Sequence, residues 1–278
     1  MIQIKTVQAF EQFRRKINGN IGFVPTMGAL HDGHQSLILE SLNQCDVTVV
    51  SIFVNPTQFS PNEDFDHYPR QNSTDVTLCE SLGVTALFMP SEAEIYPNEN
   101  KVSNYKPNES IAGILCGVSR PHFFYGVCNV VERLFNIIKP THAFFGEKDL
   151  QQRVIIQQMV RDLNVSIQIV SCPIIRDENG LALSSRNAYL DDDGYKRALN
   201  LFKALHDARL KALAADWSSH RIRQFVAAEL EGRGLKGDYV AIFRPNDGTL
   251  VHGKIQPGDY CCAAVYVDNI RLIDNIQF

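Results

Sequence analysis

The chain has 278 residues, of which 45% are hydrophobic and 21% charged, and its formal net charge is −4. These values are typical of a globular protein and exclude a disordered or fibrous chain. The slightly acidic balance also argues against nonspecific nucleic-acid binding, which needs a basic surface. At about 150 residues per domain, the length predicts two domains.

The cysteine pattern and the hydropathy indicate the compartment. Seven cysteines are scattered along the chain and none forms a C-x-x-C pair, which favours neither a disulfide framework nor a zinc ribbon. The start of the chain lacks the basic-then-apolar layout of a signal peptide, and no apolar run approaches the length of about 18 residues that a membrane span needs. We therefore expect a reduced, cytoplasmic protein without a membrane or nucleic-acid partner.

Short apolar runs alternate with segments of helical period in the first part of the chain. The runs predict strands at residues 21–24, 47–54, 84–89, 143–145 and 165–170. The second of these lacks period-two alternation, as expected of a strand that helices cover on both faces of a parallel sheet. The predicted fold class is α/β, with a Rossmann-like doubly wound parallel sheet.

The pattern changes after residue 175, and the first domain is expected to cover residues 1–175. A polar loop at 176–187 opens a smaller α+β C-terminal domain, residues 176–278. Its helices and strands are expected at 192–215, 218–231, 239–243 and 260–267. In the last strand, Cys261 and Cys262 should face opposite sides and not react. The polar stretch 91–110 is expected to be a surface excursion.

Ligands of an open α/β sheet bind beyond the carboxyl ends of its strands, and three predicted ends carry polar motifs. These motifs are P-T-M-G-A-L-H-D-G-H after residue 24, N-P-T-Q after residue 54 and G-E-K-D-L-Q-Q after residue 145. A helix beginning near Asp32 or Gly33 and running to Asn43 would present unpaired N–H groups to an anion. His31 and His34 would flank that anion and stabilise charge developing on phosphorus.

Other polar residues fit the same chemistry. Lys148 could neutralise phosphate oxygens, Asp149 could accept hydrogen bonds from ribose hydroxyls, and L-S-S-R at 183–186 suits a triphosphate and its leaving pyrophosphate. Gln58 and Gln152 could orient a carboxylate through amide donors without a tight ion pair. Taken singly, each motif is also compatible with an ordinary helix start, a solvated charge or an interdomain turn.

Together, P-T-M-G-A-L-H-D-G-H, F-V-N-P-T-Q-F, F-G-E-K-D and L-A-L-S-S-R-N resemble the pantoate–β-alanine ligase (pantothenate synthetase) family. The resemblance spans nearly the whole chain and includes E-D-F at 63–65, Y-P-R at 68–70 and R-L-I-D-N at 271–275. The wider group is the H-x-G-H nucleotidyltransferases. The resemblance implies that (R)-pantoate attacks the α-phosphorus of ATP with Mg²⁺, giving pantoyl adenylate and pyrophosphate. β-Alanine then attacks the acyl carbon, which gives pantothenate and AMP.

The resemblance also implies roles for individual residues. The catalytic residues would be His34 as proton donor, His31, Lys148, Ser184 and Arg186. The ATP-binding residues would be Met27, Gly28, Ala29, Leu30, His31, Asp32, Gly33, His34, Gly146, Glu147, Lys148, Asp149, Ile175, Leu183, Ser184, Ser185 and Arg186. Pantoate would bind to Gln58 and Gln152, with β-alanine near Gln58. The Mg²⁺ ligands are not identified, although Asp75 is a weak candidate. A homodimer built through the larger domain is implied, with the smaller domain as a mobile lid.

The chain departs from the family pattern at a few positions. Where the family reads R-P-x-H-F-x-G-V, Phe123 stands at the histidine position and His122 lies one residue earlier. Asn129 and Arg133 replace a threonine and a lysine. Leu183 replaces a methionine, which conserves volume.

Three other functions remain open. A related H-x-G-H enzyme could transfer a nucleotidyl group to a phosphate ester, but it would need a basic pocket where Gln58 and Gln152 stand. A nucleotide-binding protein without catalysis is a second alternative, for which Phe123 is the only indication. A zinc site at His31 and His34 is a third, and it lacks an evident third ligand.

Overall fold

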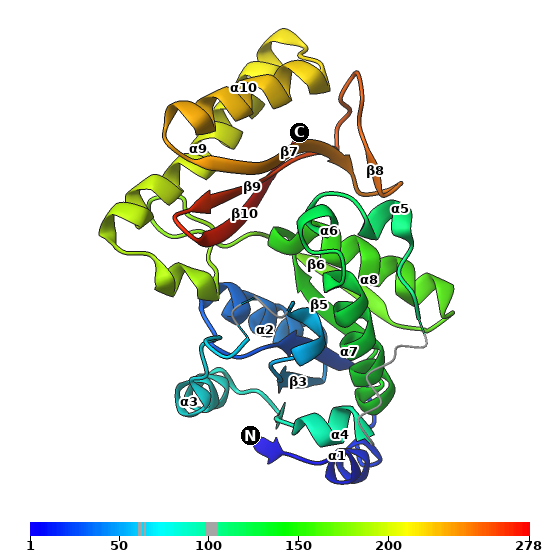
Figure 1. Ribbon diagram of the computed structural model, residues 1–278. Coiled ribbons are helices and arrows are strands. Elements are labelled where there is room, and N and C mark those ends of the chain that lie inside the picture. Colours follow the sequence, from blue (N-terminus) through cyan, green and yellow to red (C-terminus); the bar gives the residue numbers. More distant parts are fainter. Residues whose placement is uncertain (61–62, 64, 98–104) are drawn as a thin grey trace. The chain divides into compact units, whose positions relative to one another are not determined.

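The computed structural model describes residues 1–60, 63, 65–97 and 105–278 (Figure 1). Asp64 and most of the central part of the excursion expected at 91–110 lie outside the described residues. By its internal contacts the chain divides into two compact units. Unit 1 comprises Met1–Asn108, Arg120–Glu147 and Ile155–Pro173, and unit 2 comprises Glu109–Ser119, Lys148–Val154 and Ile174–Phe278.

Unit 1 is built on a parallel sheet of six strands in the order β1-β4-β3-β2-β5-β6. The strands are β1 (Ile2–Ile4), β2 (Ile21–Thr26), β3 (Val47–Ile52), β4 (Ala86–Phe88), β5 (His142–Gly146) and β6 (Gln168–Cys172). The strand order reverses between β2 and β5, so a topological switch point lies at their carboxyl ends. The doubly wound sheet predicted from the sequence is confirmed.

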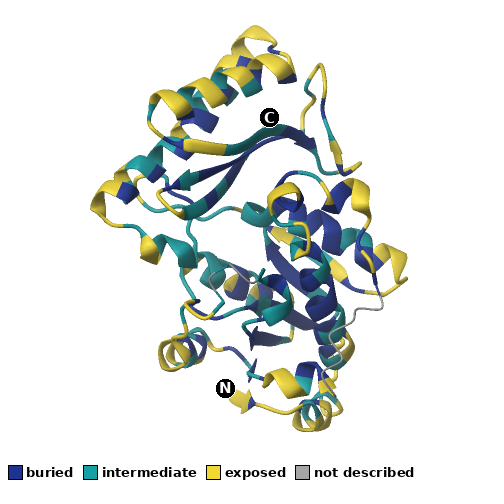
Figure 2. Cartoon of the chain, in the orientation of Figure 1, coloured by how far each residue is buried: buried dark blue, intermediate teal, exposed yellow. Residues whose placement is uncertain are grey.

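Helices cover both faces of this sheet. The longer ones are α1 (Val7–Arg14), α2 (Asp32–Gln44), α3 (Asn72–Leu82), α7 (Phe123–Ile138) and α8 (Leu150–Asp162). Neighbouring strand residues point to opposite faces. Accordingly, Phe23 meets Phe135 of α7 with ring centroids 6.2 Å apart, whereas Val24 packs in a cluster with Leu37 and Ile38 of α2. Figure 2 shows the inner strands of this sheet as predominantly buried, whereas the edge strands β1 and β6 are mostly partly buried or exposed.

Unit 2 contains an antiparallel sheet of four strands in the order β10-β9-β7-β8. Its elements are α5 (Glu109–Ala112), α6 (Cys116–Ser119), α9 (Asp192–Ala215), α10 (Ser219–Gly232), β7 (Lys236–Arg244), β8 (Thr249–Leu250), β9 (Tyr260–Val267) and β10 (Ile270–Gln277). Asp191 caps α9 by accepting the N–H of Gly194 at 2.7 Å, and Ser218 caps α10. The two helices pack against each other and share one apolar cluster with the sheet.

The adjacent cysteines of β9 behave as the alternation of a strand predicts. Cys261 belongs to the apolar cluster beneath α9 and α10, whereas Cys262 does not. Burial raises the pKa of Cys261 to about 12 and that of Cys262 well above its usual value. Because the thiolate is the reactive form, both side chains are packing groups and poor nucleophiles.

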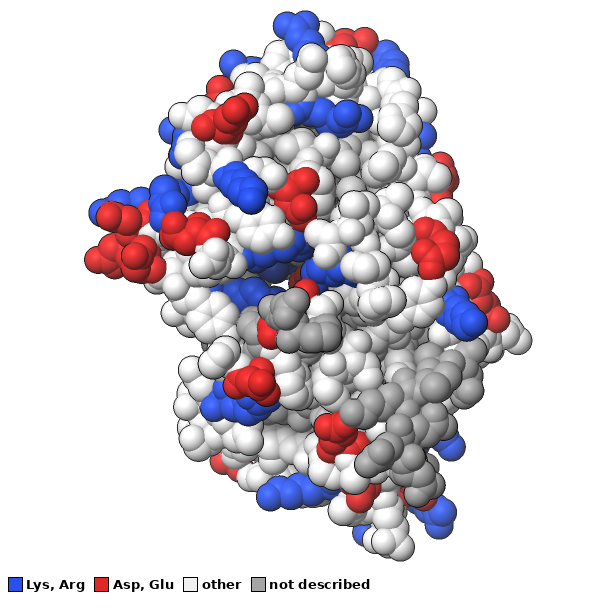
Figure 3. Space-filling model, viewed as in Figure 1, with Lys and Arg blue, Asp and Glu red and all other residues white. Residues whose placement is uncertain are grey.

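The surface of the molecule carries both signs of charge. Lys and Arg are interspersed with Asp and Glu over the face drawn in Figure 3. Among the helices in the described part of the chain, none combines the length and the apolar composition that crossing a membrane requires.

Candidate active site

Three loops of the predicted site leave adjacent strands of unit 1. The loop after β2 leads into α2, the loop after β3 leads into the short 3₁₀ helix η1 (Pro56–Gln58), and Gly146 ends β5. Because β3, β2 and β5 are neighbours and parallel, their carboxyl ends meet at one edge of the sheet. The structure therefore brings the loop at 27–34, Gln58 and Gly146 to the edge where a ligand is expected.

The loop after β2 has an unusual backbone. Gly28 and Ala29 have φ angles of 83° and 51°, both in the left-handed region, and Thr26 Oγ1 accepts the N–H of Gly28 at 3.2 Å. A Cβ added to Gly28 would lie 3.1 Å from both Asp75 Oδ2 and Ile52 Cγ2. Glycine is required at this position by the backbone conformation and by the close approach of Asp75.

Asp75 holds this loop from α3. The residue is only 1% exposed, its Oδ2 accepts the N–H of Ala29 at 2.9 Å, and its Oδ1 accepts the N–H of Leu30 at 2.8 Å. Hydrogen bonds to a charged acceptor are stronger than neutral ones. Both carboxylate oxygens accept hydrogen bonds from the loop, so the geometry gives Asp75 a loop-holding role. The metal-ligand role considered from the sequence stays a prediction.

The two histidines form the start of α2. His31 is the N-cap, and its Nδ1 accepts the N–H of Gly33 at 3.1 Å, while His34 Nδ1 accepts the N–H of His31 at 3.3 Å. This reciprocal pair is a capping box made of imidazoles. A ring nitrogen that accepts a hydrogen bond carries no proton, so the proton of each neutral ring lies on Nε2. Both rings therefore present Nε2–H donors at a positive helix end.

Gln58 is held by a buried polar cluster. Its Oε1 accepts from Asn55 Nδ2 at 3.0 Å, and Asn55 also donates to the Gly126 carbonyl at 3.0 Å and accepts from Tyr96 at 2.6 Å. With the oxygen of Gln58 occupied, its Nε2 hydrogens are the donors that can meet a carboxylate. Gly126 permits this packing, because a Cβ there would lie 2.1 Å from the Thr57 carbonyl oxygen.

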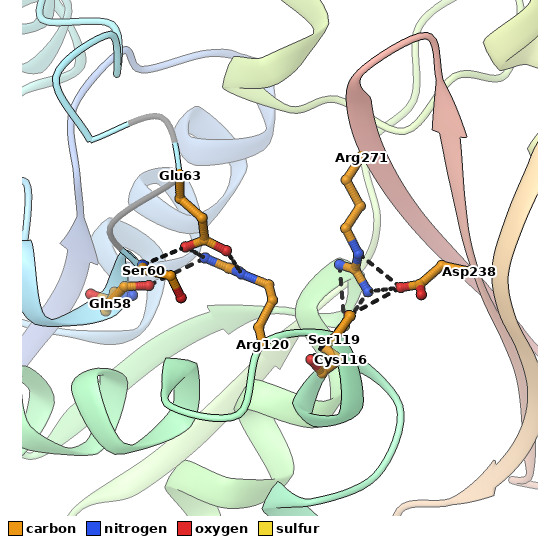
Figure 4. A network of polar contacts seen from close by, with 8 residues as sticks. All are labelled: Gln58, Ser60, Glu63, Cys116, Ser119, Arg120, Asp238 and Arg271. Atoms are coloured by element: carbon orange, nitrogen blue, oxygen red, sulfur yellow. Dashed lines mark hydrogen bonds and ion pairs between the residues drawn. The ribbon is translucent and has the colours of Figure 1, made fainter.

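The segment at 120–126, where the chain departs from the sequence pattern that it resembles, also contacts Gln58 (Figure 4). Arg120 donates to both carboxylate oxygens of Glu63, at 2.5 and 2.8 Å, and to the Gln58 carbonyl at 3.2 Å. The Arg120 guanidinium lies 3.8 Å from the centroid of the Phe123 ring. Phe123 is thus a stacking platform for the arginine that holds Gln58, while His122 is exposed at the N-cap of α7.

The replacements at positions 129 and 133 contact each other on α7. Arg133 Nε donates to Asn129 Oδ1 at 3.0 Å, and another of its nitrogens donates to the Ile95 carbonyl at 3.2 Å. The guanidinium also lies 5.0 Å from the Tyr96 ring centroid. The two departures therefore form one interaction, which ties α7 to α4 (Glu92–Ile95).

Several predicted residues belong to unit 2. Lys148 and Asp149 lie in the 3₁₀ turn η3 (Glu147–Asp149), with Lys148 Nζ 3.9 Å from an Asp149 carboxylate oxygen. Gln152 is half-buried on the first turn of α8. Its neighbour Gln151 is buried and donates to the Ile111 carbonyl at 2.8 Å, so only the second glutamine of the pair is available to a ligand.

The L-S-S-R motif lies at the start of η4 (Ser185–Tyr189) in unit 2. Ser184 is the N-cap, and its Oγ accepts the N–H of Arg186 at 3.3 Å. The Ile175 carbonyl accepts the N–H of Leu183 at 2.9 Å, so 175–183 forms a closed loop that ends at the motif. The predicted ATP-binding residues are thus divided between the two units.

The residues that sequence reasoning missed are mostly buried polar groups. Asn55 and the Arg120–Glu63 pair hold Gln58. Asp75 was considered only as a metal ligand, and its contacts with the loop after β2 were not predicted. Asn55 belongs to the N-P-T-Q motif and could have been considered as a unit with Gln58. Among the described residues, no group of three or more His, Cys, Asp or Glu is placed to hold a metal ion.

Comparisons with known proteins show which proteins the chain is similar to. The sequence model of the pantoate-beta-alanine ligase family matches residues 2–277. Pantothenate synthetase of Campylobacter fetus is 44% identical over 277 residues, 98% of each chain, and that of Clostridium botulinum is 44% identical over 278 residues, 99% of this chain and 97% of the relative.

Solved structures give the same result. The crystal structure of pantothenate synthetase from Thermus thermophilus has a TM-score of 0.93 and 36% identity, covering 100% of this chain and 99% of that one. Pantoate-beta-alanine ligase from Francisella tularensis, complexed with beta-gamma ATP and beta-alanine, has a TM-score of 0.84 and 36% identity, covering 100% and 97%.

Proposed function

The chain belongs to the pantoate–β-alanine ligase family, and we propose that it forms pantothenate from (R)-pantoate and β-alanine through pantoyl adenylate. The observation that supports this best is the imidazole capping box at the start of α2, after β2, together with a buried glutamine after the neighbouring strand β3 whose amide oxygen is held by Asn55. A helix start binds the phosphates of ATP, and the amide binds a carboxylate.

In the first step, a pantoate carboxylate oxygen attacks the α-phosphorus of ATP and pyrophosphate leaves. Gln58 and Gln152 orient the carboxylate, and the N–H groups at the start of α2 bind phosphate oxygens. His34 Nε2–H donates to the phosphorus-bound oxygen on which negative charge develops. Lys148, Ser184 and Arg186 neutralise the triphosphate and the departing pyrophosphate.

In the second step, the β-alanine amine attacks the acyl carbon of pantoyl adenylate. A carbon–nitrogen bond forms, the carbon–oxygen bond to the phosphate breaks, AMP leaves with the electron pair of that bond, and the amine nitrogen loses one proton. Gln58, which lies beside the acyl group in this arrangement, also contacts β-alanine. Because the intermediate is labile in water, its protection calls for a cover, and residues 176–278 are proposed to act as a mobile lid over residues 1–175.

Mg²⁺ is proposed to enter with ATP and to draw charge from the phosphates. Since the described residues offer no cluster of three metal-binding side chains, the phosphates and water would supply most of its ligands. We further propose a cytoplasmic homodimer formed through the larger domain.

The two products separate the two steps and test the function. With ATP, Mg²⁺ and pantoate alone, we expect pyrophosphate release limited to about one equivalent per site while the intermediate stays bound. Adding β-alanine should release AMP and allow continued turnover. Pyrophosphate release that needs a phosphate ester in place of pantoate would instead support the related nucleotidyltransferase activity. ATP binding without pyrophosphate would support the non-catalytic alternative.

Gln152→Ala should weaken pantoate binding. Loss of one or two hydrogen bonds to a charged carboxylate is expected to raise the KM for pantoate about 10- to 50-fold, with the KM for ATP within about twofold. Pantoate titrations of pyrophosphate release provide the measurement. Gln158→Ala, on the same helix two turns later, is the matched control. An unchanged pantoate KM in Gln152→Ala would remove this residue from the carboxylate site.

A further inference from the structure

The R-L-I-D-N motif at 271–275 has no role in the proposed chemistry, although it lies in β10 within unit 2. Asn275 is 4% exposed, and its Nδ2 donates to the backbone carbonyl of Lys148 at 3.1 Å. Lys148 itself is separated from Asn275 by 127 positions in the sequence. The side chain of Asn275 therefore fixes the backbone from which the Lys148 ammonium extends.

The preceding residue, Asp274, holds a second segment. It is 3% exposed, and its carboxylate oxygens accept from Arg176 at 2.6 and 2.9 Å. Asp274 Oδ1 also accepts the backbone N–H of Asn275 at 2.8 Å, which fixes the Asp274 side chain relative to the backbone of Asn275. A bidentate arginine–carboxylate pair sets direction as well as distance.

Arg176 in turn organises the loop that ends at the L-S-S-R motif. It donates to the Gly180 carbonyl at 3.1 Å, its guanidinium lies 3.8 Å from the Phe202 ring centroid, and its backbone forms an isolated bridge with Ala182. These contacts close the loop immediately before Ser184. The anchor of Arg176 on Asp274 is therefore also an anchor for the start of the motif.

The first residue of the R-L-I-D-N motif is anchored in the same unit. Arg271 donates to Asp238 at 2.8 Å and to Cys116 Sγ at 3.5 Å, and Ser119 donates to the same carboxylate of Asp238 at 3.1 Å (Figure 4). The strand that carries Asp274 and Asn275 is thus fixed at both ends of the motif.

We propose that Asp274 and Asn275 are positioning residues for ATP, because one dipeptide sets both the Lys148 turn and the loop that leads to Ser184 and Arg186. This inference rests on the proposed function, in which those residues bind the triphosphate. It assigns the C-terminal strand to the adenylation step, and not to the aminolysis step that follows.

The test is Asn275→Asp, which keeps size but places an acceptor against the Lys148 carbonyl. A buried carbonyl left without its donor is unfavourable, so the Lys148 turn should shift. We expect the KM for ATP to rise and pyrophosphate release to slow, together about 10- to 100-fold in kcat/KM. Aminolysis of supplied pantoyl adenylate should stay within about twofold of wild type. Gln277→Glu, an exposed amide-to-acid change on the same strand, is the matched control.

Two further variants keep the test decisive. Arg176→Lys retains the charge but not the bidentate pair, and it should give the same selective rise in the KM for ATP. The double variant Asn275→Asp/Lys148→Ala should have a kcat/KM for ATP less than about twofold below that of Lys148→Ala alone, because both changes act on the Lys148 ammonium. If the rates of both half-reactions fall by the same factor and the KM for ATP is unchanged, the variant merely contains a smaller fraction of active protein. That result would overturn the proposal.

The remaining outcomes distinguish a failure of the positioning role from a failure of the proposed ATP site. Suppose that Lys148→Ala raises the KM for ATP, whereas Asn275→Asp and Arg176→Lys leave that KM equal to the KM of Gln277→Glu. The positioning role is then wrong, and the ATP-binding role of Lys148 is retained. If Lys148→Ala itself leaves the KM for ATP unchanged, the ATP assignment of Lys148 is wrong and the positioning role falls with it.

Discussion

Replacing His34 by alanine is expected to lower the rate of pantoate-dependent pyrophosphate release by a factor of about 10² to 10⁴, the range for a lost proton donor. His34 Nδ1 accepts the N–H of His31, so the neutral ring keeps its proton on Nε2 and presents it as a donor. The aminolysis of supplied pantoyl adenylate should change much less. Single-turnover measurement of each half-reaction is the check.

Two amide replacements separate the donor of His34 from its capping role. His34→Asn retains an acceptor near the Nδ1 position and loses the Nε2–H, so we expect a stable fold with a rate as low as that of the alanine variant. His34→Gln places an amide N–H near the Nε2 position and should recover part of the rate, while its amide oxygen can accept the N–H of His31 as in an ordinary capping box. Near-normal adenylation by His34→Asn would contradict the proton-donor role.

Most regular elements could be predicted from the sequence because burial followed the hydrophobic pattern. The helix expected at 192–215 and the strand expected at 260–267 coincide with α9 and β9. β10 was missed because two of its buried positions carry Asp274 and Asn275. Their burial depends on partners far away in the sequence, which no periodicity can indicate. β1, with only three residues and two of them exposed, offers too little pattern to identify.

The residues of the candidate site also fall into two groups, those that could be predicted from the sequence and those that could not. The residues proposed to face a ligand follow strand ends, so the H-x-G-H loop and Gln58 could be predicted as candidates from the sequence. Residues that hold them act across the fold, as Asp75 does across 46 positions to Ala29. The departures at Asn129 and Arg133 looked like separate changes, but they are one contact between residues four apart on a helix. A contact of this kind can be identified only when the structure places both side chains.

Asp75→Asn is expected to damage both the fold and ATP binding. The amide that replaces one carboxylate oxygen would place a donor against the N–H of Ala29 or Leu30, which leaves a buried N–H without an acceptor. We expect a loss of about 2–4 kcal/mol in the free energy of unfolding. The KM for ATP should rise about 10- to 100-fold, because the left-handed backbone at Gly28 and Ala29 is no longer held.

Glu80→Gln is the matched control for Asp75→Asn, since it makes the same acid-to-amide change at an exposed position of the same helix. Urea unfolding without nucleotide or Mg²⁺ decides between the two roles considered for Asp75. A loop-holding carboxylate stabilises the free protein, so the loss of stability should appear in full under these conditions. If Asp75 were a metal ligand, Asp75→Asn would leave the stability of the metal-free protein unchanged or increased. Excess Mg²⁺ would then restore much of the ATP affinity of the variant. If Asp75→Asn is as stable as Glu80→Gln and excess Mg²⁺ restores its ATP affinity, Asp75 is a metal ligand and not a loop-holding residue.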